Sequence, residues 1–315
     1  MAKAKINDLI FNELIKRGFS LDGNTRVWNI ADSKLWYLSP EQAQDYLNLE
    51  SSEAYQKTVI QNEIDLINGN IGEILEDVDR TSWNILDLGC GDGKKAVIFI
   101  NHLKNKVKLR YCPIDISSYM VEKTIERISK LNVGEIVKFQ WNISDFENLS
   151  NVSSLLRAGE FKKNFILLLG NTLGNFEIND LLYKIRISMK EGDFVLIGNG
   201  LDNRNSAEII RSYYNKDVDK FLSHIPLQLG LKKEEIELGV NFSNSRVDLY
   251  YVIKKDKIIS FQNKNIVFKK GDRIIVAYSY KYDRHDFMSF LKMYFDDIKM
   301  YTSKDNSYAL ALCKK

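Results

Sequence analysis

A glycine-rich turn between an apolar strand and an apolar helix constrains the fold of this chain more than any other feature. Residues 84–93 (NILDLGCGDG) have the composition of a buried strand that runs into a turn with three glycines. Glycine has no Cβ, so it accepts a positive φ and lets a ligand approach the backbone closely. An apolar helical run, 96–100, follows, and a second apolar strand, 109–114, ends at Asp115. This order of strand, turn, helix, strand and acid predicts an α/β fold that holds a nucleoside.

The spacing of the glycines and the acid before them narrow the choice of ligand. The sequence reads Asp87-x-Gly89-x-Gly91-x-Gly93, whereas the dinucleotide fingerprint places its third glycine three positions after the second. This spacing disfavours a nicotinamide enzyme. The acid-first pattern resembles motif I of class I S-adenosylmethionine-dependent methyltransferases, and this resemblance implies S-adenosylmethionine as the cofactor. Asp115 is expected to accept hydrogen bonds from two ribose hydroxyls. A tight turn that holds no ligand is the alternative.

A third strand pattern, 135–141, leads into a short polar segment that ends in an acid and an aromatic residue. In class I methyltransferases, an acid after the third strand contacts the adenine amino group. The resemblance therefore implies that Asp145 binds the adenine and that Phe146 stacks on its ring. The alternative is that this segment only caps the helix predicted over 148–158.

The composition excludes several other classes of protein. Of the 315 residues, 44% are apolar and 28% are charged, which is ordinary for a globular protein. The net charge of +3 is spread among interleaved acids, so no nucleic-acid partner is expected. No apolar run approaches the ~20 residues that a membrane span needs. The three cysteines are scattered, as in a cytoplasmic protein, and the three histidines have no metal-ligand spacing, so no metal is expected.

The pattern along the chain predicts two structural parts. Strands and helices alternate between 62 and 200, which is typical of a parallel sheet covered on both faces. After Gly200 the alternation gives way to a helical stretch and to antiparallel strands over 237–280. A closing helix and strand resemble the end of a methyltransferase sheet. We therefore expect a class I methyltransferase Rossmann-like domain over 62–200 and 280–315, mostly parallel with its last strand antiparallel. The remaining residues, 1–61 and 201–279, are expected to form an α+β substrate-binding lobe.

Three further motifs resemble one particular family. Residues 169–176 read LGNTLGNF, residues 111–117 read YCPIDIS, and residues 192–198 read GDFVLIG. All three resemble the histidine Nα-methyltransferases of ergothioneine biosynthesis, a group that includes the fungal dimethylallyltryptophan N-methyltransferases. The resemblance covers roughly 35–315. It implies an enzyme that transfers the methyl group of S-adenosylmethionine to an amino acid nitrogen.

The resemblance also implies roles for residues around the cofactor. Gly89 and Gly91 would border its methionine part, and Lys95 would contact the methionine carboxylate. Asp115 would take the ribose, and Gly170 would lie against the methyl donor. Without the resemblance, Lys95 reads as a solvent-facing lysine.

Other residues match substrate-side positions of that family. Asn175 would hold the substrate amino group, and Tyr55 or a water would relay its proton. Tyr213 and Ser279 match positions that bind the amino acid carboxylate, and Tyr37 is a further substrate-side candidate. Buried tyrosines more often belong to a hydrophobic core, and Asn175 has the alternative role of a helix cap.

One departure from the family pattern concerns the substrate side chain. The histidine enzymes carry a glutamate two residues before the serine, where it bonds the imidazole, and this chain has Ala277 there. An alanine cannot accept a ring N–H, so histidine loses its evident source of selectivity. The sequence therefore predicts an N-methyltransferase for the α-amine of another amino acid or a related small amine, as a monomer or weak homodimer. A small-molecule O- or C-methyltransferase and a non-catalytic cofactor-binding module are the alternatives.

Overall fold

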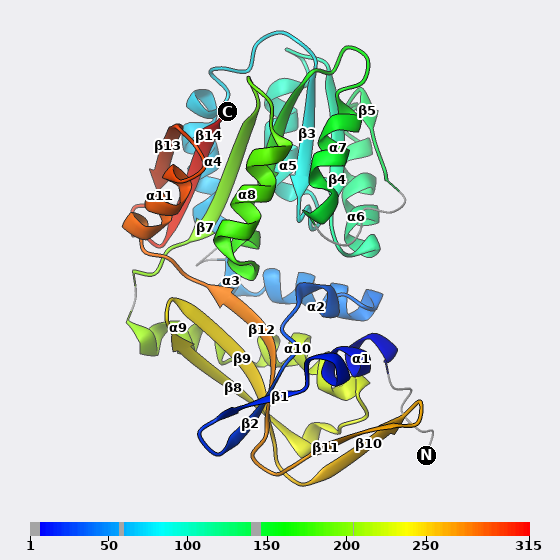
Figure 1. Cartoon of the computed structure of the whole chain (residues 1–315). Helices are drawn as coiled ribbons and strands as arrows, with labels where there is room; N and C mark the ends of the chain where they lie inside the picture. Colours follow the sequence, from blue (N-terminus) through cyan, green and yellow to red (C-terminus); the bar gives the residue numbers. More distant parts are fainter. Residues whose placement is uncertain (1–6, 57–59, 140–145, 204) are drawn as a thin grey trace. The chain divides into compact units, whose positions relative to one another are not determined.

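The computed structural model describes residues 7–56, 60–139, 146–203 and 205–315 of the chain (Figure 1). They form two compact units, each made of two separate segments of sequence. Unit 1 consists of Met1–Leu49 and Arg204–Ser279, and unit 2 consists of Glu50–Asn203 and Tyr280–Lys315. The assignment of cofactor binding to one part of the chain and substrate binding to the other stays a prediction.

Unit 2 is built around a sheet whose described strands follow the order β13-β14-β7-β6-β3-β4-β5. The strands from β7 to β5 are parallel, whereas β14 is antiparallel to both β7 and β13. Their bounds are Trp83–Leu88 (β3), Leu109–Ile114 (β4), Glu135–Ile136 (β5), Lys163–Leu168 (β6), Phe194–Gly200 (β7), Asp297–Thr302 (β13) and Tyr308–Lys314 (β14). This mostly parallel sheet with an antiparallel last strand confirms the predicted fold class.

Helices cover both faces of this sheet, which is why its central strands are buried and mostly apolar (Figure 1). Side chains alternate along β3, so that Ile85 packs among one set of helices and Leu86 among the other. The first set is α4 (Gln61–Ile74), α5 (Lys94–Leu103) and α6 (Ser118–Ser129). The second set is α7 (Leu149–Leu156), α8 (Ile178–Ser188) and α11 (Arg284–Lys292). The short helices of unit 2 are α3 (Glu53–Tyr55), η3 (Phe146–Asn148) and η4 (Thr172–Asn175).

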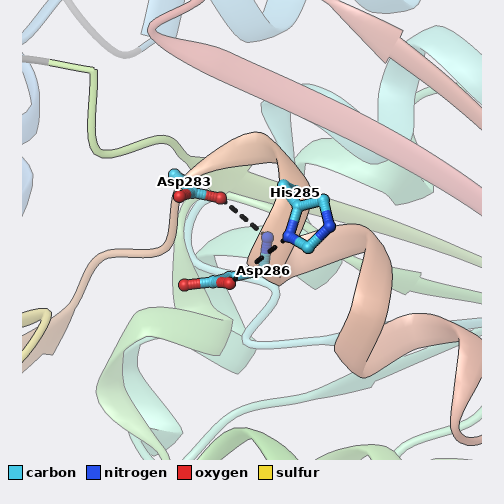
Figure 2. A group of neighbouring side chains, drawn as sticks. All are labelled: Asp283, His285 and Asp286. Atoms are coloured by element: carbon cyan, nitrogen blue, oxygen red, sulfur yellow. Dashed lines mark hydrogen bonds and ion pairs between the residues drawn. The ribbon is translucent and has the colours of Figure 1, made fainter.

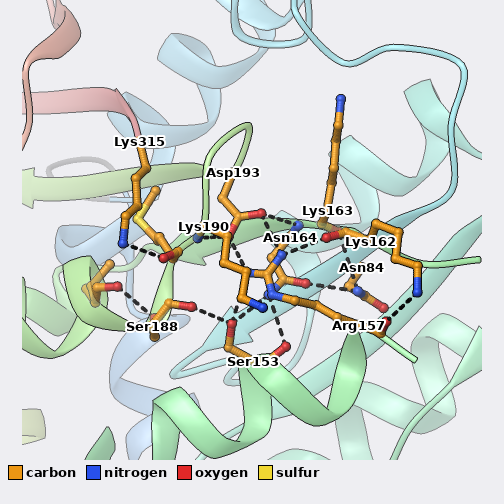
Figure 3. A network of polar contacts seen from close by, with 12 residues as sticks. Asn84, Ser153, Arg157, Lys162, Lys163, Asn164, Ser188, Lys190, Asp193 and Lys315 are labelled. Atoms are coloured by element: carbon orange, nitrogen blue, oxygen red, sulfur yellow. Dashed lines mark hydrogen bonds and ion pairs between the residues drawn. The ribbon is translucent and has the colours of Figure 1, made fainter. Parts of the chain in front are cut away.

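A buried polar network ties together the amino ends of β6 and β7 (Figure 3). The Arg157 guanidinium forms an ion pair with Asp193, and both side chains are almost fully buried. The Asp193 carboxylate also accepts the backbone N–H of Asn164 at 2.8 Å and that of Lys190 at 2.7 Å. Ser153 on α7 accepts a hydrogen bond from Arg157 at 3.2 Å. The network therefore joins α7 to β6 and β7 at the end of the sheet where these parallel strands begin.

Unit 1 is an α+β unit, as the sequence predicts. Its main sheet has the order β1-β2-β12-β9-β8, and β10 and β11 form a separate hairpin. The strands are Phe19–Asp22 (β1), Thr25–Asn29 (β2), Ile236–Ser243 (β8), Arg246–Ile253 (β9), Lys257–Phe261 (β10), Lys264–Phe268 (β11) and Arg273–Tyr280 (β12). Its helices are α1 (Asp8–Arg17), η1 (Ser33–Leu35), α2 (Pro40–Glu50), α9 (Ser206–Tyr213), α10 (Lys216–Gln228) and η5 (Lys233–Glu235), and α2 reaches unit 2 with its last residue. Aromatic pairs such as Trp28 and Phe268, whose ring centroids lie 5.2 Å apart, fill its core.

The structure differs from the sequence-based elements in a few places. The stretch 18–32, for which the sequence analysis gives no strand, contains the hairpin of β1 and β2. Phe19 and Leu21 alternate with polar residues in β1, but the strand has only four residues and all of them are exposed. The strand expected over 135–141 is limited, among the described residues, to Glu135–Ile136, and 140–145 lie outside the described part of the chain. The helical stretch 203–224 consists of the two helices α9 and α10.

Candidate functional site

The glycine turn lies at the carboxyl end of the central strand β3, between β4 and β6. Its geometry requires glycine at position 89, where φ is +70° and a Cβ would approach the Thr172 hydroxyl oxygen to 2.8 Å. The backbone N–H of Gly89 donates to the Ile114 carbonyl at 2.7 Å, which holds the turn against the end of β4. The turn is thus packed between the loops that follow the two neighbouring strands.

The acid that follows β4 is held by the same turn. Asp115 Oδ2 accepts the backbone N–H of Gly91 at 3.1 Å, and Oδ1 accepts that of Ser117 at 2.9 Å. Burial raises the pKa of Asp115 to about 6, although these backbone hydrogen bonds favour the ionised form. An ionised carboxylate has about four acceptor positions, so the oriented Asp115 keeps capacity for a ligand hydroxyl.

The acid of the glycine motif has a different environment. Asp87 is buried within β3 and accepts a hydrogen bond from the Tyr111 hydroxyl of β4 at 2.6 Å. Burial raises the pKa of Asp87 to about 6, and the hydrogen bond from Tyr111 opposes this rise. Asp87 therefore joins the two strands beneath the turn.

Lys95, in the first turn of α5, forms a buried ion pair with a glutamate of α4. Its Nζ lies 2.9 Å from Glu63 Oε2, and the Glu63 side chain is fully buried. Burial lowers the pKa of Lys95, but the charges of Glu63 and Glu50 outweigh this effect and leave the pKa raised. Lys95 is therefore an ammonium at neutral pH, with two further N–H donors besides the one directed at Glu63.

The loop after β6 passes directly beside this ammonium. Gly170 has a φ of +73°, and a Cβ at this position would lie 2.5 Å from Lys95 Nζ. Asn171 fixes the next part of the loop, because its Oδ1 accepts the backbone N–H of Gly200 at 2.9 Å. Asn175 ends the short helix η4 that follows, and its side-chain amide has no hydrogen-bond partner among the residues that the structure describes. The loop thus presents an amide that can bind a ligand.

Of the two residues predicted to contact adenine, Asp145 lies outside the described residues. Phe146 begins η3, and its ring packs against Phe176 with the centroids 5.2 Å apart and the planes tilted by 46°. Phe176 ends the loop 169–176, so Phe146 lies next to the segment that follows β6.

Tyr55 and Glu50 belong to the segment that precedes α4. Burial and Glu63 raise the pKa of the Tyr308 hydroxyl, and Tyr55 adds to this rise, so Tyr55 lies near Tyr308. Burial raises the pKa of Glu50, which the positive charge of Lys95 opposes. The charge of Glu50 thus interacts with that of Lys95, and Tyr55 interacts with the hydroxyl that bonds to Glu63.

The other substrate-side candidates lie in unit 1. The Tyr213 hydroxyl, at the end of α9, is 2.7 Å from Ser279 Oγ on β12. The Tyr37 ring packs against Phe221 with centroids 5.8 Å apart, in a cluster that also contains Tyr46. The structure thus pairs Tyr213 with Ser279. All the roles assigned to these residues stay predictions.

Glu63 and Tyr308 are the residues of this region that the sequence analysis missed. Glu63 accepts the Tyr308 hydroxyl at 2.6 Å and the backbone N–H of Gly170 at 2.9 Å. A signal for Glu63 was present, because it stands three residues after Ile60 and four before Ile67, on the apolar stripe of a helix. A carboxylate on such a stripe indicates a buried, partnered charge. Tyr308 carries no comparable signal.

A family model described as histidine-specific methyltransferase, S-adenosylmethionine-dependent, matches residues 50–315. The chain belongs to this family. It is therefore an S-adenosylmethionine-dependent methyltransferase, which confirms the predicted enzyme class and cofactor. The residues fit that cofactor, since the turn has no room for a Cβ at Gly89 and Asp115 is oriented by backbone donors.

Two solved structures are similar to this methyltransferase at low identity and low TM-score. An S-adenosylmethionine-dependent methyltransferase from Clostridium acetobutylicum ATCC 824 is 15% identical, with a TM-score of 0.47, and the match covers 86% of this chain and 98% of that one. The PH0226 protein from Pyrococcus horikoshii OT3 is 12% identical, with a TM-score of 0.46 and coverage of 88% and 99%. At such scores the likeness carries no functional assignment. Among curated proteins, none matches the chain.

Two sequence expectations about partners have a structural counterpart. No helix in the described part of the chain is long and apolar enough to cross a membrane. Figure 2 shows an exposed group at the start of α11, formed by Asp283, His285 and Asp286, whose ligand atoms lie within 4.8 Å of one another. Asp283 accepts the backbone N–H of Asp286 at 2.7 Å, so it is the N-cap of α11. Capping explains this group, and the expectation of no metal stays a prediction.

Proposed function

We propose that this methyltransferase acts on the α-amine of an amino acid or a related small amine. The observation that carries the proposal is the placement of Asn175. Asn175 ends the loop whose first residue, Gly170, lies next to the Lys95 ammonium. The amide oxygen of Asn175 has no hydrogen-bond partner among the described residues. An amide oxygen can accept an amine N–H and so direct the nitrogen lone pair away from itself.

Positioning is the main requirement of the proposed reaction. The bound cofactor supplies a methyl group on a sulfonium, and the amine must be neutral and in line with it. Orientation of this kind contributes ~7–11 kcal/mol in well-aligned systems. Asn175 cannot take the proton that the amine loses, whereas Tyr55, near the Tyr308 hydroxyl, can relay it to water.

The cofactor contacts proposed for unit 2 follow from chemistry that the structure contains. Asp115 is held by two backbone donors, Gly91 in the turn and Ser117 after β4, and such an oriented carboxylate suits a ribose. Lys95 is a buried ammonium beside Gly170, which suits a carboxylate of the cofactor's amino acid part. Phe146, the first residue of η3, supplies an aromatic ring shortly before α7.

The proposed substrate is not histidine. Ala277 is 2% exposed on β12, two residues before Ser279, and therefore on the same face of that strand. An alanine has no acceptor for an imidazole N–H. The Tyr213 and Ser279 hydroxyls lie 2.7 Å apart, and a hydroxyl is the kind of group that can donate to a substrate carboxylate.

The test combines calorimetric titration with S-adenosylhomocysteine and a methyl-transfer screen over free amino acids and small amines. We expect binding, with turnover of an amine other than histidine. Asn175→Ala should lower kcat/KM for that amine about 5- to 150-fold, as loss of one positioned hydrogen bond does, and leave the cofactor affinity unchanged. The matched control is Asn151→Ala, at an exposed position on α7. Methylation of a hydroxyl or carbon instead, or binding without any turnover, would contradict the proposal.

A further inference from the structure

Glu63 is a buried carboxylate that the proposed chemistry does not use. It accepts hydrogen bonds from three different elements: the Lys95 ammonium of α5, the backbone N–H of Gly170 after β6, and the Tyr308 hydroxyl of β14. The Gly170 N–H lies 2.9 Å from Oε1 and 3.2 Å from Oε2, so it is shared between both oxygens. All these partners belong to unit 2.

The neighbouring strand makes room for this carboxylate. Gly198 lies in the middle of β7, and a Cβ at that position would collide with Glu63 Oε1 and come within 2.7 Å of the Tyr308 hydroxyl. Its backbone is not in the left-handed region, so space rather than conformation requires a glycine here. The glycine of β7 therefore leaves the space that the Glu63 carboxylate and the Tyr308 hydroxyl occupy.

A buried ion pair is weak evidence for stability, because an apolar pair of similar size is often as stable. The Lys95–Glu63 pair is thus better explained by the position that it gives to the lysine side chain than by a contribution to stability. A lysine side chain has many rotamers, and ordering it on ligand binding costs conformational entropy. The contact with Glu63 already orders Lys95 and directs its ammonium to Gly170. The same carboxylate fixes the Gly170 N–H, and with it the start of the loop that ends at Asn175.

We propose that Glu63 is a positioning residue for the methyl donor, acting through Lys95 on the carboxylate of the donor's amino acid part. This inference rests on the proposed contact between Lys95 and that carboxylate. Its consequence is selective: Glu63 matters for ligands that carry the amino acid part and not for ligands that lack it. A purely structural role would affect both kinds of ligand alike.

The experiment compares two ligands that share the adenosine part. S-adenosylhomocysteine has the amino acid carboxylate, and methylthioadenosine lacks it. Glu63→Gln keeps the shape of the side chain and removes its charge. We expect it to weaken S-adenosylhomocysteine about tenfold or more in calorimetry, and methylthioadenosine by less than about twofold. Equal losses for the two ligands, or no loss for either, would overturn the inference.

A second variant separates this inference from the proposed function. Lys95→Met alone should weaken S-adenosylhomocysteine selectively, and the Glu63→Gln/Lys95→Met pair should be no weaker than Lys95→Met, because Glu63 acts through the lysine. If Lys95→Met leaves the affinity unchanged, the proposed role of Lys95 fails. If Lys95→Met weakens binding and Glu63→Gln does not, only the inference about Glu63 fails.

The matched control is Asp193→Asn. Asp193 is also a buried, ion-paired acid of unit 2, but its partner Arg157 lies at the amino ends of the strands. This variant should lower thermal stability and keep the wild-type ratio of affinities for the two ligands. A changed ratio in Asp193→Asn would show that destabilisation alone alters selectivity, and would overturn the inference.

Discussion

Asp115 Oδ2 accepts the backbone N–H of Gly91 at 3.1 Å, across 24 residues of sequence. This bond joins the glycine turn after β3 to the acid after β4. The two motifs that are predicted to bind the cofactor are thus joined directly, so a shift of one would break its hydrogen bond to the other. Because this hydrogen bond favours the ionised carboxylate, the turn also influences the pKa of Asp115.

Cofactor binding should depend on the ionisation of Asp115. Burial raises the pKa of this acid from 3.8 to about 6, so it is largely protonated at pH 5 and ionised at pH 7. Because an ionised carboxylate accepts more hydrogen bonds, S-adenosylhomocysteine should bind about tenfold more weakly at pH 5 than at pH 7. Asp115→Asn should bind weakly at both values, without this slope. Calorimetry between pH 5 and pH 8 measures the difference, and an affinity of wild type that is constant across this range would contradict the prediction.

The raised pKa of Asp115 should make the stability of the ligand-free protein fall as the pH rises, which is opposite to the expected trend in cofactor affinity. The folded state holds the Asp115 proton more tightly than the unfolded state does. Its contribution to the free energy of unfolding is therefore complete below about pH 4 and is lost as the pH rises through about 6. Asp87, whose pKa burial also raises to about 6, contributes in the same direction. Urea unfolding at several pH values, with Asp115→Asn for comparison, should show a smaller decline in the variant.

Two glycines of the turn should differ in their tolerance of alanine. Gly89 and Gly91 both have positive φ, which costs an alanine about 1–2 kcal/mol. Only at Gly89 does the new Cβ also meet Thr172, whereas Gly91 faces open space. We expect Gly89→Ala to lower the free energy of unfolding clearly more than Gly91→Ala in urea titrations. Thr172→Ala should recover part of the loss in Gly89→Ala, and equal effects of the two glycine variants would refute this steric account.

The network in Figure 3 should make a large contribution to the stability of unit 2. Asp193→Ala removes one partner of the buried pair and leaves the Arg157 charge uncompensated, so we expect a loss of about 3–5 kcal/mol. The exposed Lys130–Glu126 pair offers the comparison, because Glu126→Ala should cost less than about 1 kcal/mol. Thermal denaturation of both variants measures the contrast. Losses of similar size would show that burial of the Arg157–Asp193 pair has little effect.

An acceptor at position 277 should introduce histidine as a substrate. Ala277→Glu supplies the carboxylate that Ala277 lacks, and we expect the ratio of kcat/KM for histidine to that for the native amine to rise at least tenfold. Ala277→Leu changes the volume without adding an acceptor, and its ratio should stay near that of wild type. Methyl transfer to both amines, measured by mass spectrometry, gives the ratio. The same change in both variants would point to volume rather than to hydrogen bonding.

The sequence predicts the sheet of unit 2 well because most of its strands are continuous apolar runs. β3 and β6 are buried along almost their whole length, and a pattern of that kind needs helices on both faces. The hairpin of β1 and β2 escapes prediction because β1 is exposed throughout and its pairing is long-range, through β2 to β12. Short, exposed edge strands of this kind are defined by their pairing partner and not by their own composition.

The candidate site was predictable where a motif lies within one loop. Gly89, Asp115 and Gly170 each follow a strand, so their meeting at one end of the sheet follows from the fold. Glu63 and Tyr308 come from α4 and β14, and only the packed structure brings them together. Their hydrogen bond joins residues 245 positions apart, a distance over which local patterns give no information.

The antiparallel strand β14 is made last, because it lies near the end of the chain, and this has a consequence for the growing protein. The first segment of unit 2, residues 50–203, leaves the ribosome before residues 204–279, which complete unit 1, and residues 308–314 appear only after these. Until then β7 is an open edge with unpaired backbone groups, which invites association with other chains. Tyr308 is also made only at this stage, so Glu63 lacks its hydrogen bond from the Tyr308 hydroxyl until then. The hydrogen-bond set of Glu63 therefore reaches its final geometry only after β14 is translated.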